Sequence, residues 1–510
     1  MTALITPRFF SQDLPCNYSP VRKLAVFHSE PSRSSLAGIS YQSTELSSSR
    51  LLNSATTTTA SLDSSTPFHM FGPRQGGLDH CGDVFPRTLP RAIQDRPDSH
   101  EVLFSRFREQ ICPMLSFTVG QNNLWQTWIL PLTRSSESLP HAISAITALH
   151  ASTLTANVQL YIHGEASIIE SFRILNRELS RPKFEISALA TILLLASWAR
   201  WNGGFGQWKT HLNGAFAVLQ KISSPRQYIE WKSSFANIHR FLLLASTFLH
   251  MDALSDLVQS TISGENPRSD PKFRELIRRS PLILRSRVWC LPLDRWSFGF
   301  LIPVEFIYLA ADLCYEVRMA TITSDVITKA ETLKREVEQF SRGSMLTATE
   351  VVHPSDLDKQ CAVHTAEAYR YATLLFLHQV MPDIFGMTSS QYLARATVNH
   401  LSRSPPSPSV IFTQIYPLFV AGCEASTKQE QEWVKERWAV MAARMRVTNV
   451  DNCWKITQEV WRRRDAYRQL RSENAQGVAD NIDDMDPEFS VKGRLHWAAV
   501  MKDWDCVVSF

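Results

Sequence analysis

Apolar residues recur every three or four positions along most of the chain after residue 98, which is the spacing of one face of an α-helix. The stretch Ile186–Trp201 is apolar on almost every side, so we expect it to form a central, buried helix. No run of alternating apolar and polar positions is long enough to predict a sheet. The pattern predicts an all-α protein whose paired helices stack in a solenoid-like way.

Local signals predict where individual helices begin, end and become buried. Ser138 is expected to cap the helix that follows it. A helix that starts at Asp98 or Ser99 is expected to end at Pro113, because proline interrupts helical hydrogen bonds. The helix Tyr161–Ser180 is expected to bury one broad face, formed by Ile162, Ala166, Ile169, Phe172 and Leu179. Further helices are predicted over Gln207–Ile222, Ala362–Met381, Val410–Glu424, Gln429–Arg446 and Asn452–Arg471.

The first part of the chain has a different composition. Half of the residues from Pro31 to Thr66 are serine or threonine. Such a segment cannot bury enough apolar surface to offset the entropy of ordering it. We therefore expect a disordered, linker-like segment over residues 1–97 and a helical domain over residues 98–510.

Composition and charge agree with a soluble globular protein. The chain of 510 residues is 44% hydrophobic and 20% charged, and its net charge of +4 is too small to indicate binding to nucleic acid or to a membrane surface. The first residues contain no secretory signal. Three apolar stretches, Ile186–Trp201, Ile238–Met251 and Phe298–Tyr315, are too short or too charged to span a membrane. We expect an intracellular protein with no membrane partner.

The cysteines exclude two kinds of site. The nine cysteines lie at Cys16, Cys81, Cys112, Cys290, Cys314, Cys361, Cys423, Cys453 and Cys506. No CxxC pair occurs, which argues against a zinc site built from close cysteine pairs. An odd number in a long chain argues against a disulfide framework and favours a reducing compartment.

One acidic cluster could support an enzyme. NIDDMDPE, Asn481–Glu488, contains Asp483, Asp484 and Asp486, and such carboxylates can hold Mg²⁺ against a diphosphate in an all-helical terpene-type enzyme. Sites of this kind use a second polar cluster that faces the first, and the sequence offers none. We therefore favour an acidic, solvated linker between the last helices.

Other candidate sites have simpler explanations. No HExxH or HxH pattern joins the four histidines of one helical region, so we favour structural or surface roles for His141, His150, His163 and His211. GGFG, Gly203–Gly206, lacks the preceding strand of a phosphate-binding loop and predicts a turn between helices. No GxSxG nucleophile elbow is present.

Two basic runs could contact phosphates or act as an import signal. The denser run is WRRRD, Trp461–Asp465, and the looser one is Arg274–Arg287. A helix that carries its arginines on the solvent-exposed face explains them more simply. We favour that interpretation.

YPLFVAGCEA, Tyr416–Ala425, could hold a reactive cysteine next to a carboxylate. Cys423 has no neighbouring histidine or lysine that would lower its pKa, and a buried cysteine behaves as a small apolar residue. We expect Gly422 and Cys423 to allow close approach of two helices, and Pro417 to kink the helix or to lie in its first turn. We assign no catalytic residue and no metal ligand, and the sequence identifies no cofactor-binding residue.

Several separated motifs share one order with a known family. They are a W..HL.GA pattern (Trp208, His211, Leu212, Gly214 and Ala215), AYRYATLLFLHQVMP, PLFVAGCEA, QEWVKERW, EVWRRRD and the ending HWAAVMKDWDCVVSF. Together they resemble the fungal-specific transcription factor domain of binuclear zinc-cluster regulators. The resemblance covers about Asp98 to Phe510 and implies an all-α regulatory domain. It says little about mechanism, because these are mainly packing motifs.

The chain departs from this family at its start. Regulators of this type carry six cysteines near the N-terminus, which hold two zinc ions and place a short helix in the major groove of DNA. Here only Cys16 and Cys81 precede Asp98, so the zinc cluster is not present in this chain. Either an upstream piece is missing, or this is a natural member that lacks its own DNA reader. We expect zinc only with an upstream cluster, and no other cofactor.

The resemblance implies a nuclear regulator of metabolic genes, such as a secondary-metabolite or drug-response set, and not an enzyme. The partners it implies are the transcription machinery or a partner regulator, DNA only indirectly or through a missing zinc cluster, and a second copy in a homodimer. A second hypothesis is a cofactor or scaffold that pairs with a complete zinc-cluster protein. A third is an all-α enzyme acting through the acidic cluster.

A small apolar ligand is also implied. In related sterol-responsive regulators a similar helical body binds one, and here we would look for its pocket beside Ile186–Trp201. We favour a filled core at this place, because protein interiors are normally packed without sizeable voids.

Overall fold

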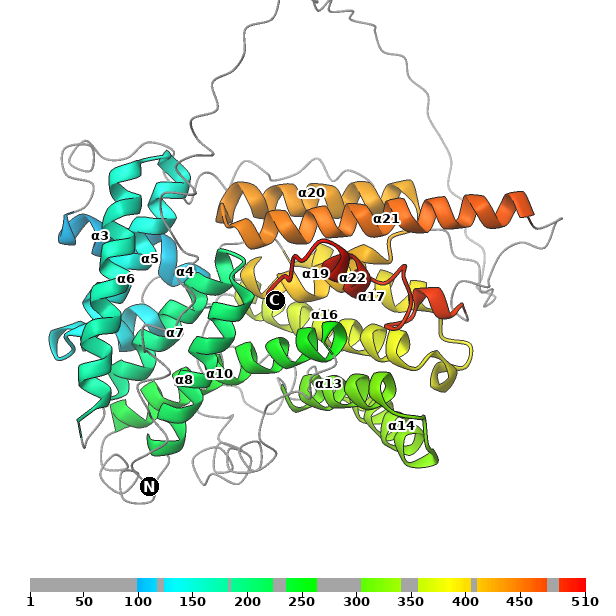
Figure 1. Ribbon diagram of the computed structural model, residues 1–510, viewed down its shortest axis with the longest axis horizontal. Helices are drawn as coiled ribbons and strands as arrows, with labels where there is room; N and C mark the ends of the chain where they lie inside the picture. The colour runs from blue at the N-terminus through cyan, green and yellow to red at the C-terminus, as the bar shows by residue number, and fades with distance from the viewer. Residues whose placement is uncertain are drawn as a thin grey trace, which may run out of the picture. The chain divides into compact units, whose positions relative to one another are not determined.

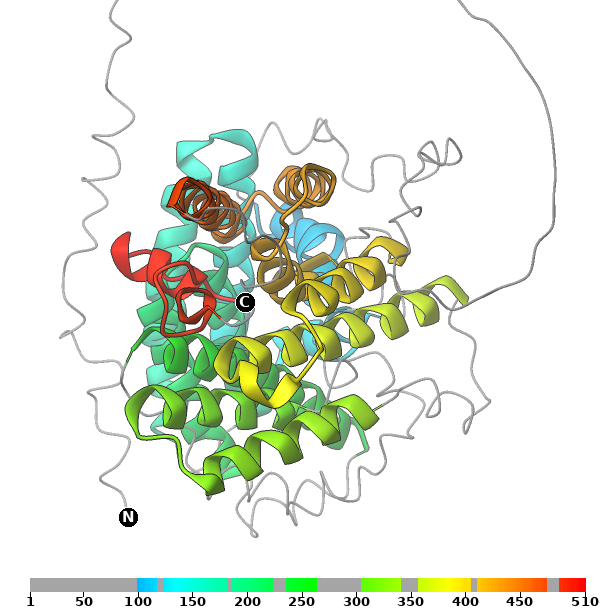
Figure 2. The same cartoon turned by 90° about the vertical axis from the view of Figure 1, so that its right-hand side faces the viewer.

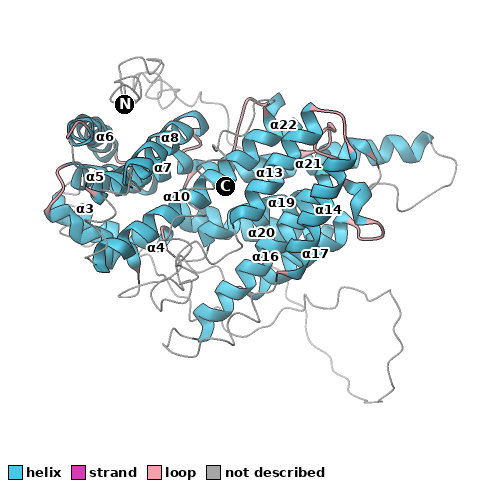
Figure 3. Cartoon of the chain, turned by 90° about the horizontal axis from the view of Figure 1, so that it is seen from below, coloured by secondary structure: helices cyan, strands magenta, loops and turns pink. Residues whose placement is uncertain are grey.

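The computed structural model describes residues 99–116, 123–181, 185–222, 235–263, 304–340, 356–404, 411–474 and 486–510. Every regular element in these ranges is a helix, and they contain no strand (Figure 3). The all-α prediction is confirmed for this part of the chain. Segment 1–97 lies outside the described residues, and both the boundary at residue 98 and the solenoid-like stacking stay predictions.

The helices of the first half gather around α7 (Ile186–Trp201). This helix contacts α5 (Ser138–Thr155), α6 (Val158–Leu179) and α8 (Phe205–Ile222), and Figure 1 shows these four helices side by side. All side chains of α7 except that of Trp198 are buried. The predicted central helix is therefore confirmed, and its lack of a polar face follows from neighbours on several sides.

The helices of the second half are α10 (Phe235–Ile262), α13 (Val304–Met319), α14 (Ser324–Gln339), α16 (Asp356–Val380), α17 (Ser390–Arg403), α19 (Ile415–Cys423), α20 (Lys428–Met445), α21 (Thr448–Asn474) and α22 (Trp497–Asp503). Two of them are central. α16 contacts α13, α14, α17 and α19, while α19 also contacts α17, α20 and α21 (Figure 2). The predicted helices in this half are confirmed, with ends shifted by a few residues.

Short helical elements complete the described chain. They are α3 (His100–Arg106), α4 (Cys112–Met114), π-helical turns at Phe107–Ile111 and Trp125–Ile129, and 3₁₀ turns at Leu130–Arg134, Pro382–Phe385, Phe412–Gln414 and Pro487–Phe489. None of the helices in the described ranges is long and apolar enough to cross a membrane.

The end of the chain packs against α19 through aromatic rings. The ring of Phe510 lies 5.5 Å from that of Tyr416, 5.0 Å from Phe419 and 6.0 Å from Trp497, measured between centroids. All four side chains are buried. Aromatic pairs at such distances stabilise beyond the area they bury, so the C-terminal residues belong to the core.

The GGFG motif forms the turn between α7 and α8, as predicted. The amide of Gly203 donates to the carbonyl of Arg200 at 3.3 Å, and that of Gly204 donates to the carbonyl of Ala199 at 2.9 Å. These two bonds make a Schellman motif, which requires a left-handed residue after the helix. Gly203 has a φ of +77°, a conformation that glycine adopts without a Cβ penalty.

The expectation that Ser138 caps its helix is wrong by one residue. Ser138 is the first residue of α5 and Glu137 holds the cap position without a capping side chain. The free amides of Glu137 and Ser138 instead donate to Oε1 of Glu178, from the end of α6, at 3.1 and 3.2 Å. A carboxylate 40 residues away accepts the hydrogen bonds that a local cap would otherwise accept. Local sequence patterns cannot reveal such a distant partner.

The predicted end of the first helix at Pro113 is also wrong. Helical turns run from α3 through the π-helical turn Phe107–Ile111 and include Pro113 in α4. The amide of Cys112 bonds to the carbonyl of Phe107, five residues back. This wider turn lets the chain continue past a residue that has no amide hydrogen to donate.

The predicted buried face of α6 is rotated. Ile162 and Ile169 are 52% and 69% exposed, and Ala166 is exposed as well. The buried residues of this helix are Leu160, Gly164, Ser167, Ser171, Ile174, Leu175 and Leu179. Small residues lie against α5 because the two helices approach closely: a Cβ on Gly164 would lie 2.5 Å from Cγ of Leu149.

Candidate functional site

The stretch Ile415–Cys423 forms α19, in which every residue is buried. Pro417 lies in the first turn, where proline is tolerated. Burial raises the pKa of the Cys423 thiol to about 12, so the thiol stays protonated and unreactive at neutral pH. The interpretation of this cysteine as a packing residue is confirmed.

Gly422 marks a close approach between helices, as predicted, and both α20 and α21 lie near it. A Cβ at this position would lie 3.0 Å from Cγ1 of Val434 on α20. The carbonyl of Gly422 accepts a hydrogen bond of 2.8 Å from Nε1 of Trp461 on α21. Even a methyl group here would require the side chain of Val434 to move by a few tenths of an ångström.

A buried ion pair joins the PLFVAGCEA motif to the EVWRRRD motif. The guanidinium of Arg464 donates to Oε2 and Oε1 of Glu424 at 2.6 and 2.8 Å, and to the carbonyl of Leu495 at 3.1 Å. Gln379 on α16 donates to Oε1 of the same carboxylate at 2.7 Å. Burial raises the pKa of Glu424, but the charge and hydrogen bonds of Arg464 outweigh it and hold this pKa below its ordinary value.

The basic run therefore divides between two environments. Arg462 is exposed and pairs with Glu459 at 2.7 Å, as expected for an arginine on the solvent-exposed face of a helix. Arg463 pairs with Glu459 and Asp503, at 2.9 and 2.7 Å. The same expectation is wrong for Arg464, which is buried. The looser run Arg274–Arg287 lies outside the described residues.

The acidic cluster is described only at its end. Asp483 and Asp484 lie outside the described residues. Asp486 caps the turn Pro487–Phe489, and its Oδ2 accepts hydrogen bonds from Tyr467 at 2.8 Å and from Arg471 at 2.9 Å. This carboxylate therefore ties the end of the linker to α21.

Two of the four histidines, His150 and His211, occupy structural positions. Nε2 of the buried His150 lies 2.9 Å from the carbonyl of Met445, and burial lowers the pKa of its imidazole. His211 stacks on Phe172 with centroids 5.5 Å apart, and burial lowers its pKa to about 4. His141 and His163 are half-buried. Within the described ranges, no three His, Cys, Asp or Glu side chains are grouped so that they could hold a metal ion.

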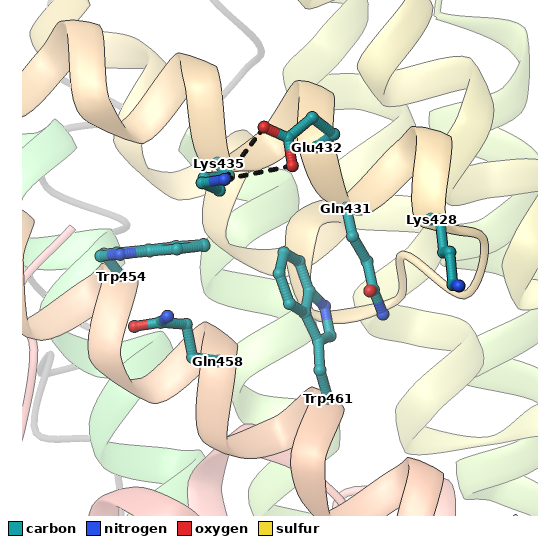
Figure 4. A pocket seen from close by; sticks show the side chains of 7 residues that line it. All are labelled: Lys428, Gln431, Glu432, Lys435, Trp454, Gln458 and Trp461. Atoms are coloured by element: carbon teal, nitrogen blue, oxygen red, sulfur yellow. Dashed lines mark hydrogen bonds and ion pairs between the residues drawn. The ribbon is translucent and has the colours of Figure 1, made fainter. Parts of the chain in front are cut away.

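Helices α20 and α21 form a hairpin with a groove of about 300 Å³ between them (Figure 4). The hairpin turns at Arg446, whose left-handed backbone has a φ of +52°. Thr427 and Glu430 fix the start of α20 with a capping box. The groove is lined by Lys428, Gln431, Glu432, Lys435, Trp454, Gln458 and Trp461.

Two tryptophans form the apolar part of this groove. Trp454 and Trp461 are seven residues apart, so two helical turns bring them to the same side of α21. Their ring centroids are 5.5 Å apart and their planes meet at 79°. The hydrogen bond from Trp461 to Gly422 fixes one of the rings. The result is a corner of two half-buried indole faces.

The polar part of the groove carries a small positive charge. Lys435 pairs with Glu432 at 3.0 Å (Figure 4). Lys428 lies at the first position of α20, where the helix dipole is positive. Two lysines and one glutamate leave a net charge of +1. The lining therefore offers indole faces, amides and a cation to a ligand.

This groove was not predicted from the sequence. There, Trp461 was part of a basic run and of the EVWRRRD motif, and Trp454 was not singled out. The spacing of the two tryptophans by seven residues, next to a helix with Lys428, Gln431 and Lys435 at helical spacing, was the available signal. The groove also differs from the predicted apolar pocket beside α7, which stays a prediction.

Comparison with curated proteins and with solved structures gave no match for this chain. A family model described as "Fungal specific transcription factor domain" matches residues 102–509. This range contains α5 to α22 and the motifs that carried the resemblance, apart from the last residue, Phe510; the resemblance is therefore confirmed. The chain belongs to the fungal-specific transcription factor domain family.

Proposed function

We propose that this chain is a nuclear regulator of transcription that controls metabolic genes, such as those of a secondary-metabolite cluster or a drug response. The family match over residues 102–509 carries the proposal, because that family consists of transcription regulators. The helical body acts as the effector domain. It recruits the transcription machinery or a partner regulator.

The environment of the reactive side chains supports binding rather than catalysis. Burial raises the pKa of the Cys423 thiol, which therefore stays protonated. The carboxylate of Glu424 is already paired with Arg464. Asp486 is engaged by Tyr467 and Arg471. The exposed groove between α20 and α21 offers recognition groups instead. An effector domain that works by contacts needs such a surface and no catalytic group.

A second candidate function is a scaffold that pairs with a complete zinc-cluster regulator and makes no DNA contact of its own. The groove between α20 and α21 supports it, since a scaffold requires a surface for a partner protein.

The proposal is tested by locating the fluorescently tagged chain in the cell and by sequencing transcripts after deletion of its gene. We expect nuclear fluorescence and altered expression of a set of metabolic genes. A cytoplasmic protein whose loss leaves every transcript unchanged would refute the proposal. A gel-shift assay with promoter fragments at stated salt separates the two candidates, because specific binding by the purified chain alone excludes the scaffold.

A further inference from the structure

We propose that the groove between α20 and α21 binds an extended, acidic, proline-containing segment of a partner protein. The proposal deepens and rests on the proposed function, because a regulator without catalytic groups acts by binding other proteins. Its seven lining residues come from two consecutive helices (Figure 4).

The tryptophan pair selects a ring-shaped apolar group. The two indoles meet at 79° with centroids 5.5 Å apart, so they offer one face and one wall to an incoming side chain. A proline ring fits such a corner, and aromatic-lined grooves are the recognised docking places of proline-rich segments. Because Trp461 is already fixed by Gly422, little side-chain entropy is lost when a ligand binds.

The two glutamines suit an extended backbone. A polyproline II segment makes no internal hydrogen bonds, so its carbonyl groups are free to accept them. Gln458 on α21 is exposed and carries an amide that can donate to such a carbonyl. On α20, Nε2 of Gln431 donates to the carbonyl of Ala425 at 3.3 Å, which fixes this side chain and leaves its Oε1 as an acceptor.

Charge selects an acidic segment over a basic one. Lys428 is exposed at the positive end of α20, and the lining carries a net charge of +1. Glu432 is paired with Lys435, so its own negative charge is largely compensated. A carboxylate beside the proline would lie next to Lys428. A lysine at the same place would be repelled.

The shape of the groove disfavours the other classes of ligand. Lys428, Glu432, Lys435 and Gln458 are exposed, whereas a small-molecule site encloses most of its ligand. The apolar lining consists of two indoles only, while an amphipathic helix needs a longer row of apolar contacts. An extended segment that crosses the groove can remain partly exposed to solvent, and it needs only one apolar contact, with the two indoles.

The test measures fluorescence anisotropy of a short labelled peptide of alternating glutamate and proline, titrated with the full-length chain. We expect saturable binding that weakens as salt is added. A peptide of alternating glutamate and alanine should bind about tenfold more weakly, because it lacks the ring. A peptide of alternating lysine and proline should bind more weakly as well. Equal binding of all three peptides, or of none, overturns the proposal.

Variants locate the binding site. Trp454→Ala should weaken binding of the glutamate–proline peptide about tenfold or more, as expected for a tryptophan at the centre of an interface. Trp504→Ala is the matched control, because Trp504, which directly follows α22, is 44% exposed and does not line the groove. Lys428→Glu, at an exposed helix end, should weaken the acidic peptide and strengthen the basic one. Unchanged affinities in Trp454→Ala and Lys428→Glu place the peptide elsewhere and overturn the proposal.

The two proposals fail in different ways. If the peptides do not bind but deletion of the gene still alters metabolic transcripts, the groove assignment falls and the proposed function stands. If the peptides bind as described but deletion alters no transcript, the groove stands as a protein-binding site and the proposed function falls.

Discussion

The guanidinium of Arg464 and the carboxylate of Glu424 form two parallel hydrogen bonds, of 2.6 and 2.8 Å, inside the protein. Their side chains are only 2% and 4% exposed. The pair connects the end of α19 with the middle of α21, and so joins the PLFVAGCEA and EVWRRRD motifs of the family resemblance. One contact therefore explains two features of the sequence: the glutamate next to Cys423, and Arg464 in the basic run.

Breaking this pair should destabilise the protein strongly. Arg464→Met leaves the carboxylate of Glu424 buried without a counter-ion, so we expect the free energy of unfolding to fall by about 3–5 kcal/mol. Urea denaturation followed by circular dichroism measures this. The double variant Arg464→Met with Glu424→Leu should recover much of the loss, because it buries no charge. Arg462→Met, on the exposed side of α21, is the control and should cost about 0.5 kcal/mol or less. A cost for Arg464→Met as small as that of the control would contradict the structure.

A buried histidine should make stability depend on pH. Burial, together with the charge of Arg200, lowers the pKa of His250 to about 3. In the unfolded chain the imidazole titrates near about 6.5. Between these values only the unfolded chain binds the proton, so acid stabilises the unfolded state. The contribution of His250 to the free energy of unfolding is fully present above about pH 6.5. It decreases by about 1.4 kcal/mol per pH unit as the pH falls from there toward 3.

Urea denaturation at several pH values below neutral compares the wild-type chain with His250→Gln. Glutamine can keep a hydrogen bond to the hydroxyl of Tyr369, which lies 3.5 Å from Nε2 of His250. The variant should show a shallower loss of stability on acidification. His150 and His496 are buried with lowered pKa values and contribute with the same sign to both proteins. Identical pH slopes for the two proteins would be evidence against a buried, neutral His250.

Two glycines should respond in opposite ways to the same added methyl group. Gly164→Ala places a Cβ 2.5 Å from Cγ of Leu149, so overpacking between α5 and α6 should cost about 1–3 kcal/mol. A Cβ on Gly206, in the first turn of α8, meets no atom within 4 Å. Gly206→Ala should therefore be neutral or slightly stabilising, because it reduces the entropy of the unfolded chain. Thermal melts of both variants check the order, and a more damaging Gly206→Ala would contradict it.

The corrected face of α6 gives a further matched pair. Leu160 is 1% exposed and Ile169 is 69% exposed. Leu160→Lys places an ammonium group in the core and should cost about 3 kcal/mol or more, whereas Ile169→Lys should change stability by about 0.5 kcal/mol or less. Denaturation curves of the two variants distinguish the observed face from the predicted one. If Ile169→Lys were the damaging change, the predicted face would be the right one.

Helix content and the central helix were predictable from the sequence, because both follow from the period of apolar residues. α7 is an example: sixteen residues without a polar side have to lie among other helices. The turn at Gly203 was predictable for a similar reason, since two glycines after an apolar helix favour a left-handed cap. Such features depend on residues that are neighbours in sequence.

The features that were not predicted from the sequence depend on residues that are distant in the chain. The buried face of α6 was misassigned because Gly164, Ser167 and Ser171 are small, and only the contact with α5 shows that small residues are required there. Glu178 satisfies the start of α5 from 40 residues away. Arg464 is buried because it pairs with Glu424, which lies 40 residues earlier in the chain. The groove exists only because α20 and α21 form a hairpin.

We propose that this helical body regulates transcription through contacts and not through chemistry. The most direct test fuses the full chain to an unrelated DNA-binding domain and measures the transcript of a reporter gene that carries the matching sites. We expect a several-fold change in that transcript relative to the DNA-binding domain alone, and the same change with Cys423→Ala, since this cysteine only packs. A folded, nuclear fusion that leaves the transcript unchanged, or one that loses its effect with Cys423→Ala while remaining folded, would contradict it.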